Sequence, residues 1–213
     1  MSLEAVYEII AKAKHAVLQN ARYRDWLEER LNFFHRSIQM PAQDPILGLE
    51  RFVLRYIDLA PRMLDCIDRL TREAGLAAQA SPFLEAGQNF FLHSGLKTLE
   101  YTGLEGLLIR AYQTHRLIEE LYDCNRSLAL RPDLGLENTE VNLLVHQLIG
   151  EPFANELDDA CQSQLRKVVN LSDYSDLNLA ACLDQANGNE WQKLRQEWEN
   201  LLPQNGISFQ FNS

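Results

Sequence analysis

Three histidines and two glutamates in the middle of the chain have types and spacings that could support metal or acid–base chemistry. They are His93 with Glu100, His115 with Glu119, and His146. Imidazole and carboxylate groups together suit first-row transition metals such as iron, manganese or zinc. One helix could supply two ligands, because the first pair lies seven residues apart and the second pair four. The pattern predicts a site for a metal or a small ligand in a bundle core, with histidines as ligands and a glutamate as ligand or base.

The same residues also fit an ordinary structural role. A histidine and a glutamate four residues apart, such as His115 and Glu119, form a common pair on a helix surface. A histidine in an apolar helix, such as His146, can hydrogen-bond a neighbouring carbonyl group. The Glu-x-x-His pair of ferritin-like di-iron proteins is absent. We therefore expect a helical binding or interaction protein, with a homodimer as one form, and keep the metal-dependent or small-ligand enzyme as the alternative.

A second candidate pattern pairs an arginine with a histidine. The segment Arg110-Ala-Tyr-Gln-Thr-His115 is similar to the Arg-x4-His signature of HEPN-type ribonucleases, which are helical bundles that dimerise. That resemblance implies a nuclease in which Arg110 and His115 act together on the 2′-hydroxyl and the phosphate of RNA. Arg30 and His35 have the same spacing, and in both segments the residue after the arginine is apolar.

The N-terminal segment carries a further resemblance. Ala11-Lys-Ala-Lys-His15, on an amphipathic stretch, is similar to the opening of haem-oxygenase-like proteins, in which such a histidine can ligate haem iron. The resemblance covers one histidine and one helix, and it implies a haem-oxygenase-like arrangement. The alternative for His15 is a surface histidine flanked by lysines.

Apolar periodicity, prolines and glycines divide the chain into eight or nine helices. The expected helices are 3–19, 22–39, 45–73 with a break or kink at Pro61, 82–130 as one kinked helix or two separated near Gly103, 140–149, 153–170, 174–186 and 189–202. Residues 207–211 alternate in polarity and are expected to be extended. We place 82–130 and 140–149 at the centre of the bundle because they are the most apolar. Trp191 and Trp198 are expected to anchor an otherwise charged helix to the core.

These elements predict an all-α fold, a compact multi-helix bundle, and the composition agrees. Leucine outnumbers valine and isoleucine together, which favours helices over strands. We expect one domain over residues 1–213, with a division into two lobes near 132–138 as the alternative.

Charge and cysteine content narrow the partners and the compartment. The net charge of −10 argues against a broad nucleic-acid surface. The sequence holds no charge-free apolar stretch of the roughly 18 residues that a membrane span needs. The four cysteines form no C-x-x-C pair and are expected to be reduced thiols of a cytoplasmic protein. The partners that these properties allow are a small-molecule ligand and a second copy of the chain in a homo-oligomer.

Overall fold

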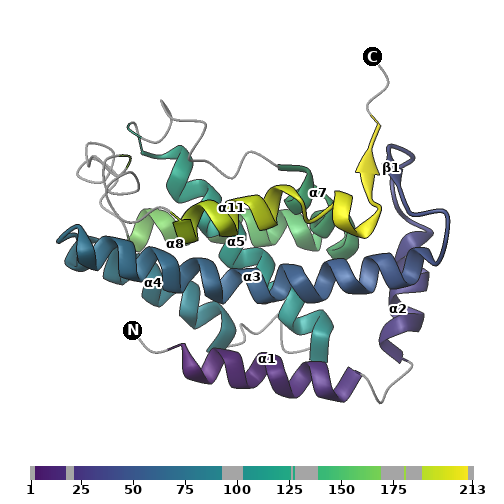
Figure 1. Ribbon diagram of the computed structural model, residues 1–213, viewed down its shortest axis with the longest axis horizontal. Helices are drawn as coiled ribbons and strands as arrows, with labels where there is room; N and C mark the ends of the chain where they lie inside the picture. The colour runs from purple at the N-terminus through teal and green to yellow at the C-terminus, as the bar shows by residue number, and fades with distance from the viewer. Residues whose placement is uncertain are drawn as a thin grey trace.

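The computed structural model of the protein is built almost entirely from α-helices (Figure 1). It describes residues 3–17, 22–92, 103–125, 127, 139–168, 180 and 189–210. The eight α-helices within these residues are α1 (Glu4–Val17), α2 (Arg22–Leu31), α3 (Pro45–Glu73), α4 (Ala77–Leu92), α5 (Gly103–Asp123), α7 (Thr139–Ile149), α8 (Phe153–Val168) and α11 (Asn189–Glu199). The short elements are a 3-10 helix, η3 (Pro203–Asn205), and the strands β1 (Ile38–Gln39) and β2 (Ser208–Phe209). The prediction of an all-α helical bundle is confirmed.

One hydrophobic core joins all of the described helices. Buried side chains from each helix belong to one cluster, which extends from Leu3 beside α1 to Ile207 beyond α11. Helices α3 and α5 each pack against several other helices and lie at its centre. The sequence predicted 82–130 and 140–149, which include most of α4, the whole of α5 and nearly all of α7, as the centre of the bundle; α5 is central, and α3 joins it there. The alternative division into lobes near 132–138 falls outside the described residues.

Helix α3 is the longest described helix, and its two ends follow from local sequence. At the start, the Asp44 side chain accepts a hydrogen bond of 3.0 Å from the backbone N–H of Leu47, and Pro45 occupies the first helical position. At the end, Gly75 has a φ of 74°, a left-handed conformation that favours glycine. The helix continues through Pro61, so the first of the two expectations there, a break, is wrong, while a kink stays a prediction. Pro61 and the two residues before it are buried, and tertiary packing holds this turn helical despite the missing N–H.

The second helix is shorter than the sequence predicted. Helix α2 ends at Leu31 instead of continuing to residue 39, and the chain then turns into β1. Strand β1 pairs with β2 in antiparallel register, with Ile38 opposite Phe209. This pairing joins segments that are far apart in the sequence, so helical periodicity could not predict it. The extended conformation expected for the tail is present in β2.

Helices α4 and α5 pack against each other as separate elements. Helix α5 begins at Gly103, the position where the sequence suggested a separation, and residues 93–102 lie outside the described part of the chain. Helix α4 begins at Ala77, before the expected start at Pro82. The expected helix at 174–186 falls almost wholly outside the described residues.

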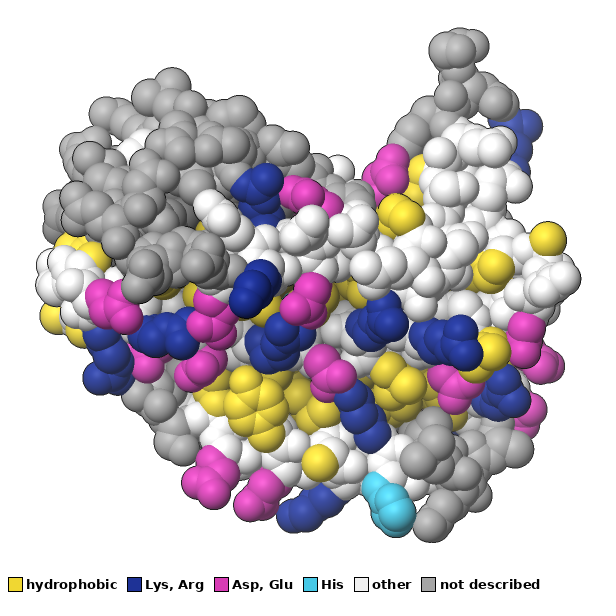
Figure 2. Space-filling view, in the orientation of Figure 1, with side chains coloured by type: hydrophobic (Ala, Val, Ile, Leu, Met, Phe, Trp, Pro, Cys, Tyr) yellow, Lys and Arg dark blue, Asp and Glu magenta, His cyan; other side chains and the backbone are white. Residues whose placement is uncertain are grey.

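Helix α11 lies along α3 (Figure 1) and is attached by buried aromatic rings and by exposed polar pairs. Trp191 and Trp198 are both buried, which confirms that they anchor this helix to the core. The polar pairs join residues of α3 that are seven positions apart to residues of the C-terminal segment that are also seven positions apart. The residue numbers rise along α3 as they fall along its partner, so the two segments run in opposite directions. The pairs are Arg62 with Glu197 and Arg69 with Glu190, whose glutamates are both on α11, and Arg55 with Gln204 of η3. Figure 2 shows these helices covered by a band of basic and acidic side chains.

Two further expectations concern the membrane and the cysteines. Within the described residues, no helix combines the length and the apolar character that crossing a membrane requires. Cys66, Cys124 and Cys161 are free thiols, and burial raises the pKa of Cys66 to about 11 and that of Cys161 to about 12. These two thiols are therefore protonated and unreactive near neutral pH.

The packing of α11 predicts a large difference between two neighbouring substitutions. Trp198→Ala removes a buried ring and should lower the free energy of unfolding by about 3–5 kcal/mol. Glu197→Gln should change it by less than about 1 kcal/mol, because the side chains of Arg62 and Glu197 are 43% and 47% exposed. Urea denaturation followed by circular dichroism measures both values. Equal losses would contradict the assignment of the aromatic rings as the main attachment.

Candidate functional site

A pocket of about 430 Å³ lies where α5, α7 and α8 meet. Its lining residues are Tyr112, Arg116 and Glu119 from α5, Thr139, Asn142, Leu143 and His146 from α7, and Asp158 from α8. Those of α5 are spaced i, i+4, i+7 and those of α7 are spaced i, i+3, i+4, i+7. Each set therefore occupies one face of its helix. We call this cavity the α5–α7–α8 pocket.

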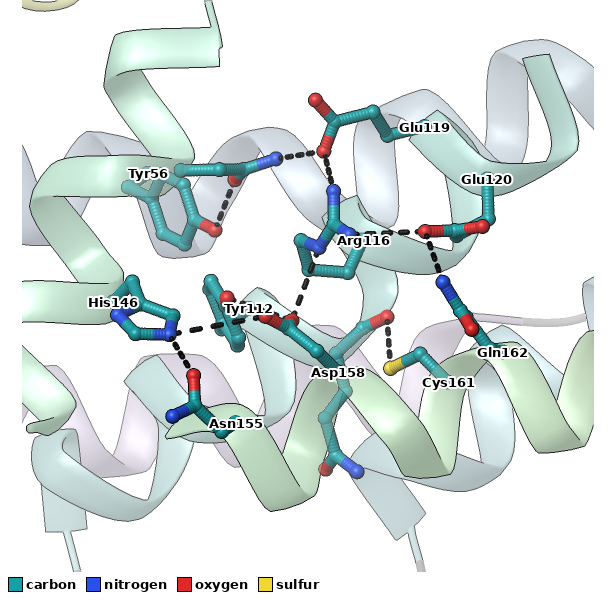
Figure 3. A network of polar contacts seen from close by, with 12 residues as sticks. Tyr56, Tyr112, Arg116, Glu119, Glu120, His146, Asn155, Asp158, Cys161 and Gln162 are labelled. Atoms are coloured by element: carbon teal, nitrogen blue, oxygen red, sulfur yellow. Dashed lines mark hydrogen bonds and ion pairs between the residues drawn. The ribbon is translucent and has the colours of Figure 1, made fainter. Parts of the chain in front are cut away.

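The guanidinium group of Arg116 lies among three carboxylates at the edge of this pocket (Figure 3). Its Nε donates to Asp158 Oδ1 at 3.0 Å, its Nη2 donates to Glu120 Oε1 at 2.9 Å, and its Nη1 donates to Glu119 Oε2. Burial disfavours the charged form of Arg116, but the carboxylates outweigh burial and raise its pKa. One positive and three negative groups leave this cluster with a formal charge of −2 at neutral pH.

Neutral hydrogen-bond donors complete the polar network around the pocket. The hydroxyl of Tyr56, from α3, donates to Asn142 Oδ1 at 2.7 Å, and Asn142 Nδ2 donates to Glu119 Oε2 at 2.9 Å. The hydroxyl of Tyr112 donates to Asp158 Oδ1 at 2.8 Å. Burial raises the pKa of both tyrosines, so they remain neutral donors. These bonds hold the pocket walls in fixed positions and connect α3 to α5, α7 and α8.

His146 lies on the α7 wall of the pocket. Its Nε2 is 3.0 Å from the amide oxygen of Asn155 and 3.8 Å from Asp158 Oδ2. An amide oxygen only accepts hydrogen bonds, so Nε2 carries the proton in this contact. The imidazole also meets the ring of Tyr112 edge to face, with centroids 6.3 Å apart. His146 is thereby oriented by α8 and by the pocket wall.

His115 occupies the hydrophobic core and does not line the pocket. Its Nε2 lies 3.0 Å from the backbone oxygen of Tyr56 and donates to it. The imidazole packs against the rings of Tyr56 and Trp198, with centroids 4.4 and 4.7 Å away. Burial lowers the pKa of His115 to about 4, although the hydrogen bond to Tyr56 opposes this shift. His115 is therefore neutral near pH 7.

The structure brings together two of the five residues that the sequence proposed as metal ligands. Glu119 and His146 line the α5–α7–α8 pocket, His115 lies in the core, and His93 and Glu100 fall outside the described residues. In the described part of the chain, no group of three or more His, Cys, Asp or Glu side chains is placed to hold a metal ion. The five-residue metal site gains no support from these contacts.

The sequence analysis missed the residue at the centre of the site and one of its partners. Arg116 and Glu120 are four residues apart, a spacing that allows an ion pair on one helix, and that pair exists. The spacing of Arg116 from two glutamates was a usable signal for a larger cluster. Asp158 had no such signal, because only the packing of α8 on α5 brings it to Arg116.

Comparison with protein-family models, curated proteins and solved structures finds no match for this chain. Its chemistry must therefore be inferred from the site itself. The described contacts do not support the two family resemblances. Arg110 Nη1 donates to the backbone oxygen of Phe91 at 2.9 Å, and His115 is fully buried, so RNA cannot reach it. His15 is exposed on α1, as expected for a surface histidine.

The environment of His115 predicts that it resists protonation. Its pKa lies below the value of about 6.5 for an unfolded chain, so the neutral form is favoured by folding. The stability that His115 contributes is present above about pH 6.5 and is lost as the pH falls toward its folded pKa, by about 3 kcal/mol in full. NMR should show its ring signals unchanged between about pH 8 and 5.5, with His115→Gln providing the assignment. Titration near pH 6.5 would contradict this account.

The contacts of Arg116 predict that its removal destabilises the protein. Arg116→Leu leaves three carboxylates around an apolar side chain and should lower the free energy of unfolding by about 3 kcal/mol. Arg116→Lys keeps the charge and should lose less. The control is Arg72→Leu, which removes an exposed pair with Asp68 and should cost less than about 1 kcal/mol. Urea denaturation compares the three variants, and equal losses in the two leucine variants would show that the cluster adds nothing.

Proposed function

We propose that the protein binds a small organic molecule in the α5–α7–α8 pocket. The observation that carries this proposal is a cavity of about 430 Å³ whose polar walls are fixed by their own hydrogen bonds. This volume falls within the roughly 300–1,000 Å³ of pockets that bind small molecules. Side chains already held in place lose little conformational entropy when a ligand arrives, which favours binding.

The walls combine apolar and polar surface in the manner of a ligand site. Leu143 lies on the α7 wall with 42% of its surface exposed, and the ring of Tyr112 lies on the α5 wall. The polar groups of Arg116, Glu119 and Asp158 occur beside them. Small-molecule sites use apolar walls for affinity and a few polar groups for orientation. Leu143 is also a large apolar side chain, and covering its exposed surface would contribute favourably to the free energy of ligand binding.

This proposal keeps the class of function expected from the sequence, a binding protein, and specifies a small molecule as its partner. It does not include a metal, because the described residues offer no set of three ligands. The expected homodimer stays a prediction from the sequence alone, and light scattering of the purified protein would measure it.

A fragment screen tests the proposal. Amide chemical shifts recorded with a collection of small cationic, neutral and anionic organic fragments should change in α5, α7 and α8 around the pocket. Leu143→Trp fills the pocket and should weaken these fragments by about tenfold or more, a loss of at least about 1.4 kcal/mol. Phe33→Trp is the matched control, because Phe33 is 68% exposed and does not line the pocket.

Two results would contradict the proposed function. One is the absence of any fragment that changes signals around the pocket. The other is unchanged fragment affinity in Leu143→Trp when circular dichroism shows that the variant is folded.

A further inference from the structure

We infer that the ligand of the α5–α7–α8 pocket carries a protonated amine, which Glu119 and Asp158 bind, and an apolar body that packs on Leu143. This inference rests on the proposed function and adds the chemical class of the ligand. Three features of the pocket support it: the balance of charge, the hydrogen-bonding capacity that remains on the walls, and the apolar surface beside the carboxylates.

The charge balance favours a cation over an anion. Arg116 is the only lysine or arginine among the described residues that line the pocket. Each of its three nitrogens already donates to a different carboxylate. An anionic ligand would have to compete with these carboxylates for Arg116 and would meet their excess negative charge. A cationic ligand would reduce that excess instead.

The two carboxylates of the pocket retain part of their capacity to accept hydrogen bonds. Glu119 receives hydrogen bonds from Arg116 and Asn142 on Oε2, and its Oε1 receives none within the described residues (Figure 3). Asp158 receives hydrogen bonds from Tyr112 and Arg116 on Oδ1. Its Oδ2 lies 3.8 Å from the Nε2 of His146, too far for a hydrogen bond. Each carboxylate therefore retains one oxygen that can accept.

The tyrosine and histidine donors of the same walls are already in use. The hydroxyls of Tyr56 and Tyr112 donate to Asn142 and Asp158, and the Nε2–H of His146 points at Asn155. The oxygens that remain on Glu119 and Asp158 are matched by a ligand that supplies donors. An ammonium group carries three N–H donors and no acceptor, which matches two carboxylate oxygens. A carboxylate ligand brings only acceptors and matches neither.

An organic cation also fits better than a metal ion. A metal would need several ligand groups around one point, and the described residues contain no set of three. Leu143 and the ring of Tyr112 provide apolar surface for a hydrocarbon or aromatic body beside the carboxylates. A compact arylalkylamine combines both properties, and phenethylammonium is a simple representative of this class.

Three probes of similar shape and different charge test the inference on the full chain. Phenethylammonium, 2-phenylethanol and 3-phenylpropanoate are titrated by NMR at low ionic strength. The ammonium should bind in the pocket at least about tenfold more tightly than the other two, a difference of about 1.4 kcal/mol. Added salt should weaken the ammonium and leave the neutral alcohol almost unchanged, because only charged partners are screened.

Conservative substitutions locate the interaction. Glu119→Gln removes the charge, and its amide oxygen can still accept from Arg116 and Asn142, so the network is retained. It should weaken phenethylammonium by about tenfold and leave 2-phenylethanol unchanged, and Asp158→Asn should act in the same way. Glu197→Gln is the control, because Glu197 pairs with Arg62 on α3 and lies outside this pocket. It should bind all three probes like the unaltered protein.

The outcomes separate the inference from the proposed function. Equal or tighter binding of the alcohol or the carboxylate in the pocket would overturn the inference and leave the proposed function standing. The same applies if Glu119→Gln and Asp158→Asn, both folded, bind the ammonium unchanged. If no probe and no screening fragment binds in the pocket, both the proposed function and the inference are wrong.

Discussion

The structure depends on the hydrogen bonds that one buried tyrosine makes through its hydroxyl group and its backbone carbonyl. Tyr56 is fully buried in the middle of α3, so its hydroxyl needs a hydrogen-bond partner in the core, and its backbone carbonyl also accepts a side-chain hydrogen bond. Asn142 of α7 accepts from the hydroxyl, and His115 of α5 donates to the carbonyl. The ring between them packs on Trp198 of α11 at a centroid distance of 5.8 Å. One side chain and its backbone thus fix three other helices relative to α3.

The pocket is a consequence of the same requirement. Asn142 is held by Tyr56 and in turn donates to Glu119, which binds Arg116, which binds Asp158 of α8. Each of these polar groups is partly or fully buried and is stabilised by the next group as its hydrogen-bond or ion-pair partner, because a partly buried charge without a partner is costly. The chain of contacts ends at the cavity, where two carboxylates each retain one free oxygen among the described residues. The acceptors that remain on these two carboxylates therefore follow from how the core places its own donors.

Much of the fold could be predicted from the sequence, because helices record their buried faces in local periodicity. The two tryptophans of α11, seven residues apart, correctly indicated its attachment to the core. The failures occurred where distant segments decide the local structure. Helix α2 ends at Leu31 and the chain goes on to Ile38, which pairs with Phe209. Helix α3 continues through Pro61, which is buried together with Leu59 and Ala60. Neither the pairing nor this burial is visible in a window of neighbouring residues.

The candidate site shows the same limit more sharply. His115 and Glu119 are only about 40° apart around α5, and the sequence assigned them to one site. The structure separates them, since His115 faces Tyr56 and Trp198 while Glu119 faces Arg116 and Asn142. A metal-binding histidine must present an unprotonated nitrogen to the ion. The Nε2 of His115 carries a proton and donates it to the Tyr56 carbonyl, and its unprotonated Nδ1 is enclosed in the core without a partner among the described residues. Helical spacing can group residues on one face, but the donor and acceptor needs of the packed neighbours decide which of them remain available for chemistry.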